Sequence, residues 1–510
     1  MARRARPVSL PRWPGAVAAA LVLFIVVGTL LAVGLGANGP ASLGAADLAA
    51  IRFTIVQALV SALFSVVLAV PVARALARRK FRGRGLLITL LGAPFILPVI
   101  VAVLGLLAVF GRNGLLNEAL AVLGFAKVSI YGFWGVILAH VFFNLPLAVR
   151  FLLQGWLDIP VERFRLAASL GVPVWRVLEV PMLRAVIPGT FVVIFVMCLT
   201  SFAVALTLGG GPRATTVELA IYQAVRFDFD LGKAAVLSVV QFGLCALAAV
   251  LAWRVSGERA LGAGLDRVVQ RWDRGGLGVD IVALGLAFLF LILPLGMVVL
   301  RGLPSLFELP PLVFEAALRS VAVALVSTAL AIAISLAMAI RGGGVMSLVG
   351  ALPLAASSLV LGTGLFLIVQ PFISPPKLAL AVTALLNAVM SLPFVLRVIQ
   401  PAVAQVEADY GRLADSLGLR GWNRMRILVL PRIRRPLGFA AGLTAALSMG
   451  DLGVIALFAT DGQATLPLVM YQLMGSYRTG QSAGAALLLL ILSLGLFWIF
   501  DRGGRSDAAS

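Results

Sequence analysis

Few side chains in this 510-residue sequence could carry out chemistry, and they are scattered. There is one histidine, His140, and two cysteines, Cys198 and Cys245, each inside an apolar stretch. Isolated residues of this kind provide neither a disulfide framework nor the clustered ligands of a zinc site. The four lysines are followed by Phe, Val, Ala or Leu, so the nucleotide-binding pattern G-x-x-x-x-G-K-[ST] does not occur. The sequence therefore predicts no catalytic residue, no metal site and no ATP hydrolysis by this chain.

Asp451, in the segment SMGDLG, is the one carboxylate well inside an apolar stretch. Such a residue can attract a cationic solute, or it can accept hydrogen bonds from the backbone of a helix broken by glycines. Both interpretations stay open. Two pairs, Tyr222-Gln223 and Tyr471-Gln472, could cap a pathway with aromatic faces suited to a cation, or could belong to an interfacial aromatic belt.

One polar motif occurs twice, as RLAASLGVPVW over residues 165–175 and as RLADSLGLRGW over residues 412–422. In each copy, three apolar residues at i, i+1 and i+4 are expected to share one face of a short helix. They are Leu166, Ala167 and Leu170, and Leu413, Ala414 and Leu417. Gly171 and Gly418 then suit the left-handed turn that ends a helix. A helix this short needs a partner for its apolar face, either the membrane surface or another protein. The duplication favours a dimeric protein partner.

The elements that position these motifs are membrane spans. The chain is 61% hydrophobic and only 12% charged, whereas soluble domains are about 25% charged, and its mean hydropathy is +1.07. Apolar runs of about 20 residues cross a bilayer. Twelve such spans are predicted, at residues 15–36, 53–73, 86–110, 133–153, 186–208, 234–253, 279–300, 320–340, 346–370, 378–396, 436–458 and 482–500. The expected fold class is an all-α polytopic membrane protein.

The net charge of +20 follows the topology of these spans. With the N-terminus inside, 31 of the 41 Lys and Arg residues lie at cytoplasmic ends. This asymmetry is the positive-inside rule, and it predicts that both termini are cytoplasmic. The basic residues are therefore interpreted as topology signals, and no nucleic-acid partner is predicted.

The chain is written as two similar halves, predicted at residues 1–265 and 266–510. Leu145-Pro146 and Leu392-Pro393 are separated by the same 247 residues as the two polar motifs, and ALVS at 58–61 recurs at 324–327. Six spans in each half place the halves in the same orientation, related by an axis along the membrane normal. A solute pathway between two such halves makes transport the expected function. By the separation of 247 residues, Asp451 is expected opposite Val204 of the first half.

The polar motifs resemble the EAA motif of permease subunits of ATP-binding-cassette importers, E-A-A-x3-G-x9-I-x-L-P. The matching residues are Ala167, Gly171 and Pro181 in the first copy, and Gly418, Leu430 and Pro431 in the second. Arg165 and Arg412 stand at the position of the motif's Glu, and Leu166 and Leu413 at its first Ala. The resemblance implies the type I importer permease fold, with loops 160–188 and 405–436 docking on an ATPase.

Four further segments look like the fused permeases of bacterial thiamine and thiamine pyrophosphate importers. They are VFGRNGLLN (109–117), LAHVFFNLPLAVRFLLQ (138–154), LTLGGGPRATTVELAIYQA (206–224) and SMGDLGVIALF (448–458). This resemblance implies an inner-membrane permease that works with a homodimeric ATPase and a periplasmic thiamine-binding protein, and no cofactor in this chain. A ferric-iron importer permease is the alternative substrate assignment. An ion-coupled secondary transporter is the other alternative, although it usually needs more buried ionisable residues than one carboxylate.

Overall fold

The computed structural model of the chain describes residues 13–37, 43–92, 96–211, 214–255, 276–460 and 462–505. These residues form helices and connecting turns, with no strand among them. Eleven helical segments within these ranges are long and apolar enough to cross a membrane, and a bent helix pair adds a twelfth. The predicted all-α polytopic class and the twelve spans are confirmed. The predicted boundary between the halves, at residues 265 and 266, lies outside the described residues.

The elements before residue 256 are as follows: α1 (Trp13–Gly36), α2 (Ala45–Arg78), α3 (Arg84–Leu90), α4 (Val99–Phe110), α5 (Leu115–Val122), α6 (Phe133–Leu157), α7 (Val161–Ser169), the π-helical turn η2 (Trp175–Glu179), α8 (Val180–Leu199), α9 (Ala203–Leu208), α10 (Val217–Arg226) and α11 (Leu231–Val255). The helices α2 and α6 pack along each other, and α8 packs against both.

The elements after residue 276 are α12 (Leu277–Ser305), η4 (Leu306–Glu308), α13 (Pro311–Arg341), α14 (Gly344–Ala351), η5 (Leu352–Ala355), α15 (Ser358–Val369), η6 (Pro375–Leu378), α16 (Ala379–Ser416), α17 (Gly421–Arg424), the π-helical turn η7 (Met425–Val429), α18 (Leu430–Arg432), α19 (Arg434–Met449), α20 (Gly453–Phe458), α21 (Leu466–Gly475) and α22 (Thr479–Arg505). Here α13 packs along α16, and α19 packs against both.

Four of the predicted spans are interrupted by a few residues that are not helical. Span 86–110 divides into α3 and α4, and span 346–370 into α14 and α15, which meet at 89°. Spans 186–208 and 436–458 end as the short helices α9 and α20. A hydropathy window sums apolar character over its whole length, so it does not register a few non-helical residues inside the run.

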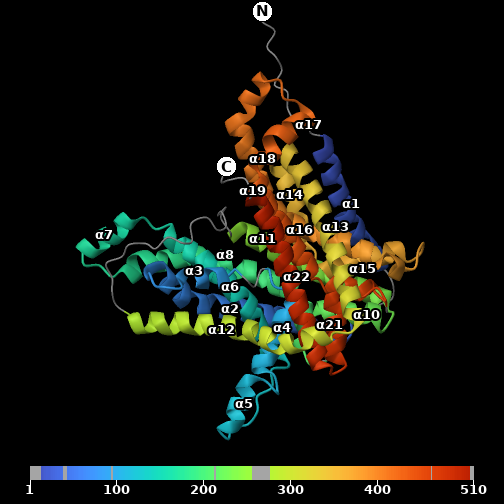
Figure 1. The fold of residues 1–510 in the computed structure, drawn as a ribbon, viewed down its shortest axis with the longest axis horizontal. Coiled ribbons are helices and arrows are strands. Elements are labelled where there is room, and N and C mark those ends of the chain that lie inside the picture. The colour runs from blue at the N-terminus through green and yellow to red at the C-terminus, as the bar shows by residue number, and fades with distance from the viewer. Residues whose placement is uncertain are drawn as a thin grey trace, which may run out of the picture.

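The first helix of each predicted half packs against helices of the other half. The helix α1 contacts α13 and α15, whereas α12 contacts α2 and α4. In Figure 1, α7 lies at the left end of the molecule and α17 near its top, far from each other. The two copies of the polar motif thus lie at separate ends of the molecule. The helices α1 and α12, each packed against the other half, connect the two halves.

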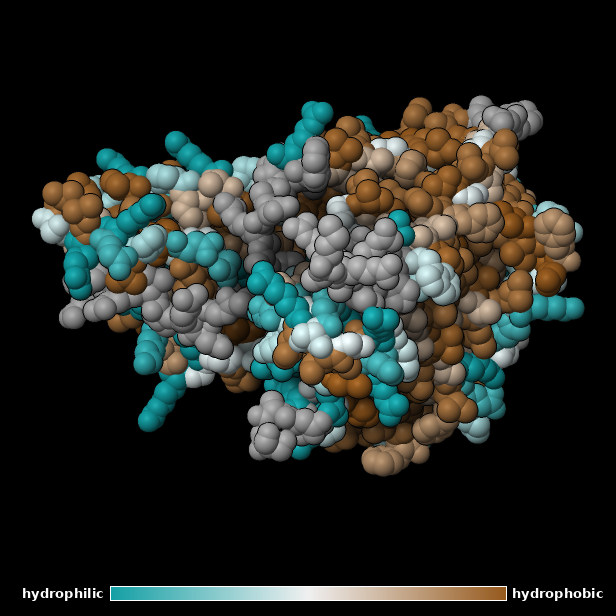
Figure 2. Space-filling view, turned by 90° about the horizontal axis from the view of Figure 1, so that it is seen from above, coloured by the Kyte–Doolittle hydropathy of each residue, from teal (hydrophilic) through white to brown (hydrophobic). Residues whose placement is uncertain are grey.

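The surface of the helical body is apolar, as a membrane-embedded body requires. Figure 2 shows a broad hydrophobic surface at the right of the view, and hydrophilic residues gathered at its left end and in its lower middle. Large exposed apolar residues include Phe24 of α1 and Leu286 of α12.

Candidate functional site

The first polar motif forms the short helix α7 and the turn that follows it. Pro160 precedes α7 and has an extended backbone, so α7 is separated from α6. Gly171 has a φ of +65°, the left-handed conformation predicted for the end of this helix. The side chains of Phe164 and Ala167 are buried, whereas Leu166 and Leu170 are exposed.

The second motif is built differently, because no proline separates it from its span. The helix α16 continues through the motif to Ser416, and Gly418 then takes a φ of +68°. Three additional residues follow before the π-helical turn, where the short helix α17 lies. This insertion explains why the first copy is three residues shorter between its glycine and Pro181 than the second is before Pro431. Both prolines stand in the first turn of the next helix.

The prediction that all three apolar residues of each motif share one outward face was wrong. Ala167 and Ala414 are 3% and 1% exposed, so they pack inside the chain, while the flanking leucines point outward. Residues at i and i+4 lie on the same side of a helix, but the residue at i+1 is turned by about 100°.

Matched apolar side chains surround both motifs at the surface. They are Leu166, Leu170, Trp175 and Val177 at the first loop, and Leu413, Leu417, Trp422 and Ile427 at the second. We call these two groups the first and second docking faces. Arg165 and Arg412 are exposed beside them. Two equivalent apolar faces at separate ends are suited to two equivalent sites on a partner.

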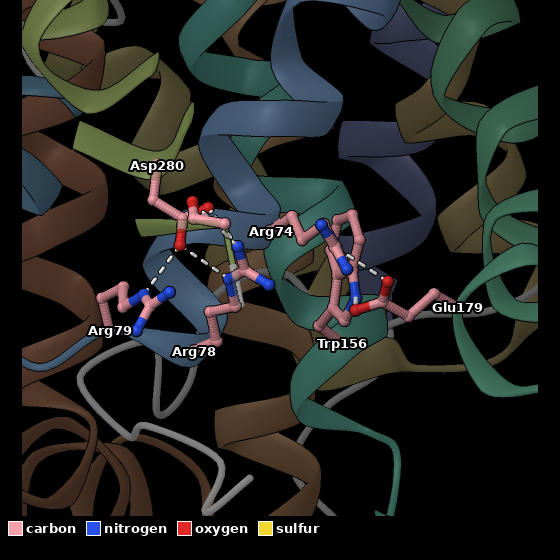
Figure 3. Close-up of polar contacts among 7 residues, drawn as sticks. Arg74, Arg78, Arg79, Trp156, Glu179 and Asp280 are labelled. Atoms are coloured by element: carbon pink, nitrogen blue, oxygen red, sulfur yellow. Dashed lines mark hydrogen bonds and ion pairs between the residues drawn. The ribbon is translucent and has the colours of Figure 1, made fainter. Parts of the chain in front are cut away.

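Behind the first docking face lies a buried ionic contact that sequence reasoning missed. Glu179, at the end of η2, is fully buried. Its Oε2 accepts a hydrogen bond from Nε of Arg74 at 2.8 Å, and its Oε1 accepts one from the indole N–H of Trp156 at 3.2 Å (Figure 3). The Arg74 guanidinium also lies 5.2 Å from the centre of the Trp175 ring. The acid inside the apolar run VLEVP was the signal for this site.

The second loop is held by a different set of charges. Arg424 of α17 is buried and donates hydrogen bonds to Glu407 and, at 2.6 Å, to Asp415, both on α16. Burial lowers the pKa of Arg424, but the two carboxylates outweigh that effect and raise it above its usual value. The Arg432 guanidinium stacks 3.6 Å from the Tyr410 ring centre. The two loops thus expose similar apolar residues, but different buried charged residues hold them in place.

Asp451 lies in the break between α19 and α20. Its carboxylate lies next to the first turn of α20, close to the backbone of Gly453, Val454 and Ile455. Its Oδ2 atom is buried and has no hydrogen-bond partner among the described residues. Asp451 therefore lies where it can cap the backbone of α20, with its Oδ2 atom left without a partner in the described part of the chain, and both interpretations of this residue stay predictions.

The position opposite Asp451 is Ser201 rather than Val204, which corrects the sequence prediction. The matching breaks comprise residues 200–202 and 450–452, a separation of 250 residues. The separation of 247 that relates the polar motifs no longer applies here, because of the three residues inserted at α17. The break in the first half therefore carries the hydroxyl of Ser201 where the break in the second half carries the carboxylate of Asp451.

The predicted Tyr-Gln pairs lie on α10 and α21. The side chain of Tyr222 is buried in a hydrophobic cluster, and that of Tyr471 is half-buried and packs against the same cluster. Gln223 and Gln472, one residue further along, are exposed. The two tyrosines thus belong to one hydrophobic cluster, whereas the two glutamines are exposed.

Another buried carboxylate, which the sequence analysis did not single out, is that of Glu218 on α10. Its Oε1 accepts a hydrogen bond from Gln241 at 2.9 Å, and Gln241 also donates to the carbonyl of Leu199. Cys198 and Cys245 are free and buried. Within the described ranges, no three His, Cys, Asp or Glu side chains group as metal ligands would.

Eleven apolar helical segments and a bent pair that makes a twelfth, two matched loops and buried polar residues at helix breaks are typical of a polytopic transport permease. The chain is 39% identical to the thiamine transport system permease protein ThiP of Brucella abortus, over 96% of this chain and 95% of that protein. It is also 39% identical to the ThiP proteins of Salmonella typhimurium and Escherichia coli, over 98% of each chain. No protein-family model matches the sequence.

Similarity of this extent leaves no large part of the chain unaccounted for. The chain belongs to the ThiP family of ATP-binding-cassette transport permeases. Proteins of this family are membrane subunits of transport systems and are not enzymes in themselves.

Proposed function

We propose that this chain is the permease subunit of a thiamine importer, and that it forms the pathway by which thiamine, and also thiamine pyrophosphate, enters the cytoplasm. The observation that carries the proposal is the 39% identity, over 96–98% of the chain, to permeases named for thiamine transport. The chain would lie in the bacterial inner membrane with both termini in the cytoplasm. Residues 1–265 and 266–510 would form two parallel permease halves.

Transport in this proposal is driven by a separate homodimeric ATPase, and this chain holds no cofactor. The two docking faces support this arrangement, since each exposes two leucines at equivalent positions, together with one tryptophan and one β-branched residue. Large exposed apolar groups on a cytoplasmic loop are suited to a protein groove. In this proposal Ala167 and Ala414 support the docking faces from inside the chain. The other coupling residues predicted from the sequence are retained, namely Arg165, Leu166, Leu170, Gly171, Pro181, Arg412, Leu413, Leu417, Gly418 and Pro431.

The solute would be delivered by a periplasmic thiamine-binding protein and would pass Asp451. Thiamine is a cation, and the buried Oδ2 of Asp451 carries negative charge that the backbone of α20 compensates only in part. Tyr222 and Tyr471 would add aromatic faces, which attract organic cations. Gln223 and Gln472 would lie toward the outer opening.

Reconstitution tests the proposal. The permease, its ATPase and the binding protein are placed in proteoliposomes, and uptake of labelled thiamine is measured with and without ATP. We expect ATP-dependent uptake that a protonophore does not abolish. Uptake of ferric iron in its place would establish the alternative substrate, and uptake driven by an ion gradient without ATP would establish a secondary transporter.

A further inference from the structure

The ionic contact behind the first docking face has an apolar counterpart behind the second. Arg74, Trp156 and Glu179 come from α2, α6 and η2. The equivalent positions on α13, α16 and η7 are Ile340, Val403 and Val429. Val403 and Val429 are buried in one cluster, and Ile340 packs against it. The same three elements therefore meet in both halves of the chain, once through charges and once through aliphatic side chains.

This difference indicates that the charged residues do more than fill the space between the three elements. A buried ion pair is in general no more stabilising than well-packed apolar residues of similar volume, because desolvation of the charges offsets their attraction. The aliphatic set shows that this junction can be packed without charge. The first half nevertheless retains a carboxylate with two directional hydrogen bonds, and directional bonds fix one relative geometry of the joined elements.

The contact continues into the other half of the chain through α2. Arg78 lies one helical turn after Arg74, on the same side of α2. It pairs with both oxygens of Asp280 on α12, at 2.7 Å each, and Arg79 adds a bond of 2.7 Å to the same carboxylate (Figure 3). The side chains of Arg78 and Asp280 are about 95% buried. The first helix of the other set, α1, has no acidic residue to form such a bond.

We propose that Glu179 is a positioning residue for transport. Through Arg74 it ties the first docking face to α2, and through Arg78 and Asp280 the end of α2 ties that face to α12. Movement of the ATPase at the first docking face is then passed to the second half of the permease by a rigid connection. At the second face, Arg424 of α17 pairs instead with two residues of the preceding helix α16, within the same half, so the two loops are linked to the rest of the permease in different ways. This inference rests on the proposed function.

The first test replaces the ionic set by the aliphatic set that the chain already uses. The triple variant Arg74→Ile, Trp156→Val, Glu179→Val is assembled with the ATPase and binding protein in proteoliposomes. We expect it to retain the ATPase, but to take up about fivefold less thiamine per ATP hydrolysed, a typical coupling effect. Val429→Ile, an apolar change at the matching position, should leave that ratio unchanged. An unchanged ratio in the triple variant would overturn the proposal.

A double-mutant cycle keeps the test decisive if the triple variant does not fold. Glu179→Gln and Asp280→Asn are measured singly and together, again as uptake per ATP. If both act along one connection through α2, the double variant is no worse than the worse single variant, whereas independent structural effects add. Additive losses would overturn the proposal. The unmodified complex is the reference, so a wrong substrate assignment appears there, before any variant is compared.

Discussion

Gly450 lies so close to Pro98 that a Cβ atom on Gly450 would stand 2.9 Å from the Pro98 Cα atom. Gly450 ends α19 at the break beside Asp451, and Pro98 precedes α4. The two predicted halves therefore approach each other closely, backbone to backbone, at the break between α19 and α20. A side chain between them has no space.

The variant Gly450→Ala is expected to disturb this approach. Overpacking of a tight contact costs about 1–3 kcal/mol, so the purified permease should denature at a lower temperature and take up less thiamine. Gly495→Ala on α22 is the matched control, because a Cβ there meets nothing within 4 Å. Equal behaviour of the two variants would show that the contact gives way without cost.

The docking faces predict which changes release the ATPase. Leu413→Glu places a carboxylate on an exposed leucine, so the permease itself should fold normally. If this leucine enters an apolar groove of the ATPase, an unpaired buried charge costs several kcal/mol, and the ATPase should no longer co-purify. Asp409→Asn, an exposed change on the same helix, is the control. Full retention of the ATPase by Leu413→Glu would argue for a helix that lies on the membrane surface.

Ala414→Glu should act by another route, because Ala414 is buried within the permease. The new carboxylate would have to enter the packing between α16 and its neighbours or force the loop open. We expect loss of the ATPase together with faster cleavage of residues 405–436 by added protease. Leu413→Glu should not change that cleavage rate, so limited proteolysis separates the two variants.

Asp451→Asn removes the charge and retains an oxygen that can accept the backbone hydrogen bonds of α20. If the charge attracts the cationic solute, thiamine uptake falls while ATPase binding and thermal stability are retained. Ser201→Ala, at the matching break, should have a smaller effect. Unchanged uptake by Asp451→Asn would assign the residue to capping alone.

Cysteine labelling in intact cells tests the topology. The native Cys198 and Cys245 are buried, so background labelling should be low. Val122→Cys on α5 and Ser169→Cys on α7 are both at exposed positions. An impermeant thiol reagent should label the first and not the second. The reverse pattern would contradict the cytoplasmic assignment of the docking faces.

The sequence by itself determined the membrane class, the positions of the twelve spans and the duplicated loop with its turn glycines. These features follow from local properties. A run of about 20 apolar residues has to avoid water, and Gly171 and Gly418 are suited to a left-handed turn whatever surrounds them. The similarity of the two loops could be seen because the same local pattern is written twice.

Only the tertiary structure decided which residues of that pattern face outward, where spans break and what supports each loop. Ala414 is buried because α16 presents it to neighbouring elements, and the counterpart of Asp451 is Ser201 because three inserted residues at α17 shift the register. Glu179 depends on Arg74, 105 residues away in the sequence. Contacts between distant segments are set by packing and charge pairing in the folded chain, which local spacing does not specify.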